Sequence, residues 1–183
     1  MFDISQENED DALITSLNTE APVRNVTFLP DNKMAIVLDH EEVLMWKTED
    51  SEAFKTMTRE DFTVAIKRKI TPWTYVAGCH YDAKAEKTYF LAGSSCSSNP
   101  CLRILSLSSK NKLKPFSDLH SKSATNTLIR CTAMASDGTS FITGSEDGLI
   151  CVWSRQGDES EKMESLHLKA KKKDKKDKKP YSK

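Results

Sequence analysis

The chain has 183 residues, of which 38% are hydrophobic and 30% charged, and its mean hydropathy is −0.55. This composition allows one or two domains with a packed core but excludes a membrane-spanning helix, because no run approaches the roughly 18 apolar residues that a bilayer requires. Residues 1–11 contain five acidic side chains and no basic one. That pattern is the reverse of a signal peptide and predicts an intracellular protein.

The formal net charge of zero conceals an uneven distribution of charge along the chain. The tail 169–183 holds nine lysines and two aspartates, a net of +7, so residues 1–168 carry 18 basic and 25 acidic side chains, a net of −7. The five cysteines are odd in number and form no C-x-x-C pair. This favours reduced thiols over a disulfide framework.

Three groups of short strands follow one another along the chain, each separated by polar turns. The first group is predicted at 23–29, 34–38 and 43–46. The second, less regular group is predicted at 73–81, 88–92 and 102–107. The third is predicted at 128–134 and in a hairpin over 140–153, where Gly148 supplies the positive φ of the tight turn. Each group predicts an antiparallel meander.

The segment 59–70 interrupts this order and supports two interpretations. Phe62, Ala65, Ile66 and Ile70 would share one face of a helix, whereas Phe62, Val64 and Ile66 also alternate as they would in a strand. Both conformations remain open, and no function is assigned to the segment.

The strand groups recur with a nearly fixed period. Phe2, Trp46, Leu105 and Trp153 stand where the third strand of each group ends, and they are separated by 44, 59 and 48 residues. This is close to the period of about 40 to 45 residues of a four-stranded propeller blade, with one insertion. We therefore expect an all-β fold, a partial β-propeller of about three four-stranded antiparallel blades plus a remnant, with a disordered basic C-terminal tail.

The predicted organisation divides the chain into six segments. They are the remnant of an upstream blade (1–20), a first blade (21–58), the insertion (59–70), a degenerate blade (71–119), a final blade (120–156) and a charged, lysine-rich tail (157–183). No fourth strand is expected after Trp153, because 157–162 are charged and polar. A ring needs about four to eight blades, so we expect the chain to be the C-terminal fragment of a longer propeller.

The final repeat, TGSEDGLICVW at 143–153, resembles the WD-repeat family of β-propellers. The resemblance implies a hydrogen-bond network of His120, Ser145, Asp147 and Trp153 that stabilises the blade, since a buried carboxylate needs donors and a buried indole needs an acceptor. The sequence departs from the family pattern where Leu119 precedes His120, where Ser154 follows Trp153, and where Leu105 replaces a tryptophan. The resemblance also implies a protein-binding platform without catalytic activity.

Signatures of catalysis and metal binding are missing from the sequence. None of G-x-S-x-G, G-x-x-x-x-G-K-S/T or H-E-x-x-H occurs, and the four histidines are scattered. Cys79, His80, Cys96 and Cys101 are possible soft ligands, but their spacing does not match the paired cysteines of zinc sites. We therefore expect no enzyme, no metal and no other cofactor.

The lysine-rich tail is the segment outside the blades with the clearest functional signal. Its candidate residues are Lys171, Lys172, Lys173, Lys175, Lys176, Lys178 and Lys179. Such a run can direct a protein to the nucleus or nucleolus, or contact RNA weakly and nonspecifically by neutralising phosphates, or only aid solubility.

The sequence thus predicts a non-enzymatic interaction scaffold whose partners are other proteins and the missing upstream blades of its own longer form, with no membrane contact. The alternative is a nuclear, nucleic-acid-associated factor that is tethered to RNA by its tail.

Overall fold

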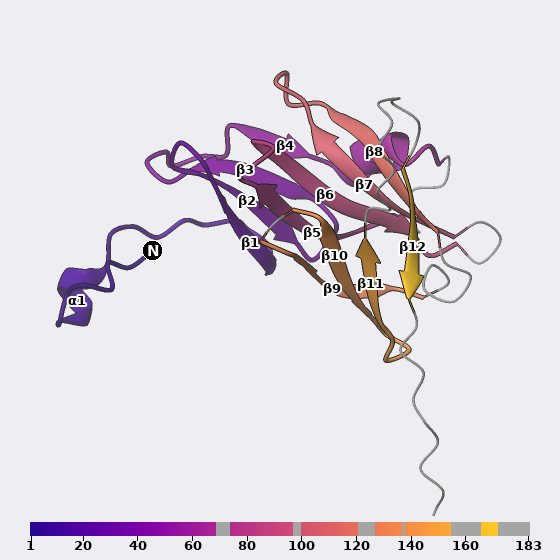
Figure 1. The fold of residues 1–183 in the computed structure, drawn as a ribbon. Helices are drawn as coiled ribbons and strands as arrows, with labels where there is room; N and C mark the ends of the chain where they lie inside the picture. Colours follow the sequence, from indigo (N-terminus) through magenta and orange to yellow (C-terminus); the bar gives the residue numbers. More distant parts are fainter. Residues whose placement is uncertain (69–73, 97–99, 121–126, 137, 155–165, 172–183) are drawn as a thin grey trace, which may run out of the picture. The chain divides into compact units, whose positions relative to one another are not determined.

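The computed structural model describes residues 1–68, 74–96, 100–120, 127–136, 138–154 and 166–171. The chain divides into two compact units, Met1–Thr58 and Arg59–Lys183, and each is considered by itself. Figure 1 labels the helices and strands of both. No helix in the described ranges is both long and apolar enough to cross a bilayer.

The first unit contains a four-stranded antiparallel sheet in the order β1 (Val23–Leu29), β2 (Lys33–Leu38), β3 (Val43–Lys47) and β4 (Lys55–Met57). The three longer strands confirm the predicted first meander. On one face, Trp46 of β3 lies opposite Met34 of β2 and packs with Ile36 and Leu38. The sheet is therefore a complete four-stranded blade, in which the short strand β4 was not predicted.

The first fifteen residues form a short loop whose two ends are hydrogen-bonded to each other. Phe2 pairs antiparallel with Leu13 in an isolated bridge, and the Met1 carbonyl accepts a hydrogen bond from the Ile14 N–H at 3.0 Å. Between them lies the short helix α1 (Glu9–Ala12), whose N-cap Asn8 accepts from the Asp10 N–H. The Asn8 cap and the acidic residues of the first turn favour a helix at this place.

The second unit begins with the helix α2 (Arg59–Ala65), which settles the conformation of the insertion. Phe62, Ala65 and Ile66 are buried while Val64 is exposed, and this pattern matches a helix and excludes a strand. The Phe62 ring meets the Phe90 ring edge-on at 5.7 Å. The helix therefore packs on the following sheet.

That sheet contains β5 (Thr74–Asp82), β6 (Lys87–Ser94), β7 (Cys101–Leu107) and β8 (Leu113–His120), which pair antiparallel with one another in this order. The final blade contains β9 (Ile129–Met134), β10 (Ser140–Ser145), β11 (Ile150–Ser154) and β12 (Leu166–Lys171). These strands are hydrogen-bonded in the order β5-β6-β7-β8-β12-β11-β10-β9.

The strand β12 corrects the expectation that nothing follows Trp153 in the final blade. It pairs antiparallel with β11 and parallel with β8. Leu168 lies opposite the buried Leu119, and Ala170 lies opposite the buried Trp153, so the apolar residues of this alternating segment are in register with the core. Lys169–Lys171 of the tail thus belong to a strand, and the tail lysines from Lys172 onward lie outside the described residues.

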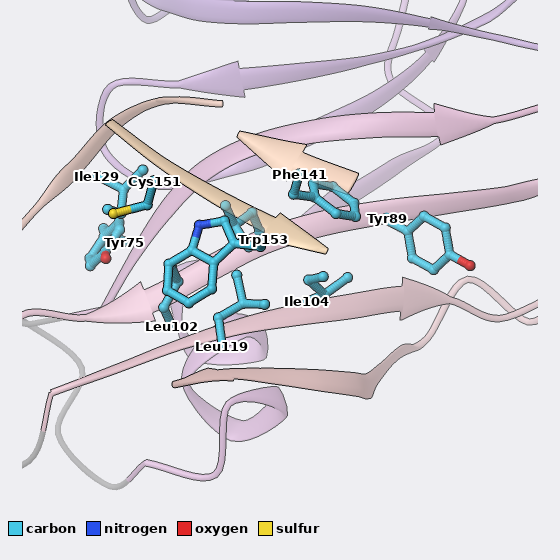
Figure 2. Close-up of a cluster of buried hydrophobic side chains, with 10 residues drawn as sticks. Tyr75, Tyr89, Leu102, Ile104, Leu119, Ile129, Phe141, Cys151 and Trp153 are labelled. Atoms are coloured by element: carbon cyan, nitrogen blue, oxygen red, sulfur yellow. The ribbon is translucent and has the colours of Figure 1, made fainter. Parts of the chain in front are cut away.

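The core of the second unit lies between the β5–β8 blade and the β9–β12 blade (Figure 2). One blade contributes Tyr75, Tyr89, Leu91, Leu102, Ile104 and Leu119, and the other contributes Ile129, Phe141, Cys151 and Trp153. Blade-on-blade packing of apolar side chains therefore holds this unit together.

Candidate functional site

The turn of the β10–β11 hairpin is held by Ser145 and Asp147. The Ser145 hydroxyl donates to Asp147 Oδ1 at 2.5 Å, and the Leu149 N–H donates to the same oxygen at 3.2 Å. The Ser145 hydrogen bond is the main reason that the pKa of Asp147 lies below its usual value. Gly148 has φ 77°, as the tight turn predicted. This pair stabilises an exposed turn.

Trp153 lies deeper in the blade and has a different partner. Its indole Nε1 donates to the Thr143 hydroxyl oxygen at 2.9 Å, and both side chains are buried. Trp153 is in register with Phe141, which makes Thr143 its diagonal neighbour on the same face. Ser145 is four residues beyond Phe141, about 14 Å along the strand, and is too far away to accept from the indole.

Two pairs therefore stand where the sequence predicted one network. Ser145 is joined to Asp147, and Trp153 is joined to Thr143, while the side chain of His120 lies outside the described residues. Sequence reasoning missed Thr143. The alternation of strand β10 could have identified it, because residues 141 and 143 face the same side.

The other blades show what replaces the Thr143 hydroxyl. In the first blade, register places Ile36 at the corresponding position, and Trp46 Nε1 instead donates to the Asp50 carbonyl at 2.8 Å. In the second blade, Ala92 is at this position and Leu105 replaces the tryptophan. Each of the two tryptophans thus donates to an oxygen, a main-chain carbonyl in the first blade and a threonine hydroxyl in the last.

The first strand of the first blade and the first strand of the last blade each carry an arginine at the same place. Arg24 is the extra residue of a β-bulge in β1, and its guanidinium donates to both Glu41 carboxylate oxygens at 3.0 and 2.8 Å. Arg130 is the extra residue of a bulge at the corresponding place in β9, and its Nε donates to Glu146 at 2.9 Å. Each arginine fixes the turn between the second and third strands of its blade.

His80 of β5 contacts β9, and so joins the first strands of the two blades in the second unit. Its Nε2 is 2.7 Å from the Thr132 hydroxyl oxygen, and its ring lies edge-on to Phe141 at 5.7 Å. Burial lowers the pKa of His80. A Cβ at Gly78 would lie 2.3 Å from the Thr132 hydroxyl oxygen, so glycine allows this close approach.

The described residues contain no group of three or more His, Cys, Asp or Glu side chains that could hold a metal ion. Of the possible ligands weighed from the sequence, Cys79 is buried, and His80 uses Nε2 to contact Thr132. Burial raises the pKa of the Cys151 thiol, and the charge of Asp147 adds to this effect. Both effects disfavour the thiolate that a cysteine nucleophile requires.

Comparison with solved structures agrees with this geometry. The β-propeller domain of Myceliophteria thermophila Cps50 (Swd1) matches 92% of this chain with a TM-score of 0.61 and 13% sequence identity. The chain has the fold of a WD40 β-propeller. The C-terminal WD40 domain of Sif2 matches 75% of the chain with a TM-score of 0.46 and 14% identity. The chain spans 50% of the Cps50 domain and 33% of the Sif2 chain, and no family model matches its sequence.

Proposed function

We propose that the chain is a non-enzymatic scaffold that binds other proteins through its turns and blade faces. The observation that carries this proposal is the propeller fold, which presents hydrogen-bonded turns on blades of antiparallel strands. The polar pairs described above support the proposal because they hold turns and blades in place: Ser145 with Asp147, Arg24 with Glu41, and His80 with Thr132.

We further propose that the working ring contains blades beyond those in residues 1–183. The Cps50 domain, of which the chain spans half, supports this view. One source of the further blades is a longer form of the chain, similar to WD-repeat-containing protein 89. Three features resemble that protein: the Phe2-Asp3-Ile4 segment, the acidic stretch after it and the lysine-rich end. A longer reading frame encoding upstream blades would support this source, and a stop codon just upstream would contradict it.

The +7 tail favours a second candidate function, in which the chain is a nuclear factor that contacts RNA through its lysines. Phosphate neutralisation would make that contact weak, nonspecific and steeply dependent on salt. The same lysines would direct the protein to the nucleus or nucleolus.

A deletion of 172–183 separates the two candidates and leaves strand β12 intact. Full-length and shortened chains are used to capture proteins, with and without nuclease, and are tested for binding to a single-stranded RNA between 50 and 200 mM salt. The scaffold is supported if the same proteins are captured by both chains and by nuclease-treated samples. It is contradicted if capture requires RNA and disappears with the tail. Fluorescent fusions of the two chains test nuclear localisation.

A further inference from the structure

The last blade exposes a continuous apolar face. Ile142 of β10 lies in register with Ala133 of β9 on one side and Val152 of β11 on the other, so these three residues form one row across three strands of the blade. In β12 the row continues at Lys171. Ile142, Ile150 and Val152 are 40%, 72% and 44% exposed, and Cys131 on the same face is exposed too. We call Cys131, Ala133, Ile142, Ile150 and Val152 the open face.

The preceding blade shows what normally covers these positions. The two blades can be aligned by register, because Phe141 pairs with Trp153 as Phe90 pairs with Leu105. In this alignment, Ile142, Ile150 and Val152 correspond to Leu91, Leu102 and Ile104. Leu91, Leu102 and Ile104 are each only 1% exposed, because the tryptophan side of the next blade packs on them. Figure 2 shows Leu102 and Ile104 in this cluster with Trp153. The open face therefore has the positions and the apolar character of a blade junction.

The first unit carries the matching half of such a junction. On the tryptophan side of its sheet, Val26 lies opposite Ile36 and Phe28 lies opposite Met34. Val26 and Phe28 are 45% and 68% exposed, although Ile36 and Met34 beside them are buried. In the second unit, this is the side of a blade that receives the preceding one.

We propose that a second copy of this chain covers the open face, with the tryptophan side of its first blade packed against Ile142, Ile150 and Val152. This inference deepens the proposed function, on which it rests, by naming the source of the further blades. The contact is head-to-tail, joining two different surfaces, and it either closes into a ring or continues as a filament. Two copies would supply six blades, within the range of about four to eight blades of known rings.

The first test measures the mass of the full 183-residue protein by light scattering coupled to size exclusion. We expect a dimer that dissociates on dilution, and we expect Ile142→Lys with Val152→Lys to give a monomer. Val64→Lys is the matched control, because Val64 is an exposed apolar residue of α2 outside both surfaces. Thermal unfolding must remain cooperative in each variant.

Mixing variants tests the head-to-tail geometry. A chain with Val26→Lys and Phe28→Lys should also be a monomer, but an equimolar mixture with the Ile142→Lys, Val152→Lys chain should form heterodimers, because one intact junction remains. An isologous dimer would not be restored in this way.

A covalent test does not depend on folding of the lysine variants. In a Cys131→Ser background, Val26→Cys should cross-link to Ala133→Cys of a second copy under diamide, because these two positions correspond by register to Thr132 and Gly78, which approach closely in the second unit. Omitting either new cysteine should abolish that product. The proposal is overturned if the wild-type protein stays monomeric at tens of micromolar, or if mixing and cross-linking both fail. In that case the scaffold function would still be judged by its own capture experiment.

Discussion

The indole Nε1 of Trp153 donates to the Thr143 hydroxyl oxygen at 2.9 Å, and both groups are buried between two blades. Thr143→Val keeps the shape of the side chain and leaves the indole N–H without its acceptor. We expect a loss of about 1–3 kcal/mol in the free energy of unfolding, the usual cost of a buried unsatisfied donor. Urea unfolding measures it. Thr143→Ser retains the acceptor and should lose less, and equal effects of Val and Ser would contradict this role.

Gly138 and Gly148 form a matched pair of turn glycines with φ 72° and 77°. A Cβ at Gly138 would lie 2.6 Å from Asp82 Oδ2, whereas a Cβ at Gly148 would have no atom within 4 Å. Gly148→Ala should cost only the left-handed backbone penalty, about 1–2 kcal/mol. Gly138→Ala should cost more, because it also displaces Asp82 from its turn. Thermal denaturation of both variants checks the order, and a reversed order would refute the argument.

Most strands could be predicted because alternating apolar residues and polar turns mark them locally. The exceptions have identifiable causes. The strand β4 has only three residues, and β8 contains Pro115, which lies at a register shift opposite Leu105. Proline and charged residues weaken a strand pattern, so the sheet around β8 overrides its local sequence. The strand β12 follows a charged segment that indicated no further structure.

The site was harder to predict than the fold because its partners meet through register. Arg24 and Glu41 are 17 residues apart, and Arg130 and Glu146 are 16 apart. A β-bulge places each arginine close enough to contact its turn. No local sequence pattern predicts such a bulge. The sequence placed Ser145 in a network with Trp153 and left out Thr143, because a motif resemblance identifies residues but not their distances from the indole.

Arg103 anchors helix α2 to the β7–β8 pair. Its Nη1 donates to the Ile66 carbonyl at 2.6 Å, and its Nε lies 2.5 Å from Asp118 Oδ1. Arg103→Lys cannot reproduce this planar arrangement, so we expect a loss of about 1–3 kcal/mol and faster hydrogen exchange in α2. Arg130→Lys is the control, because its exposed pair with Glu146 should contribute about 1 kcal/mol or less. Unchanged exchange in α2 would count against the anchor.

His80 should make the stability of the protein depend on pH below about 6.5, the ordinary histidine pKa. Burial lowers its pKa in the folded state, so the unfolded chain binds the proton more readily than the folded chain. Stability linked to His80 is therefore complete above the unfolded pKa and falls as the pH drops below it.

The variant His80→Gln isolates this contribution. Glutamine can still hydrogen-bond the Thr132 hydroxyl but does not titrate, and every carboxylate of the chain is unchanged. We expect the urea midpoint of the wild-type protein to fall more steeply than that of the variant between pH 7.5 and 5. Parallel profiles would show that His80 takes up its proton equally well in both states, and would contradict the partial burial of its ring beside Thr132 and Phe141.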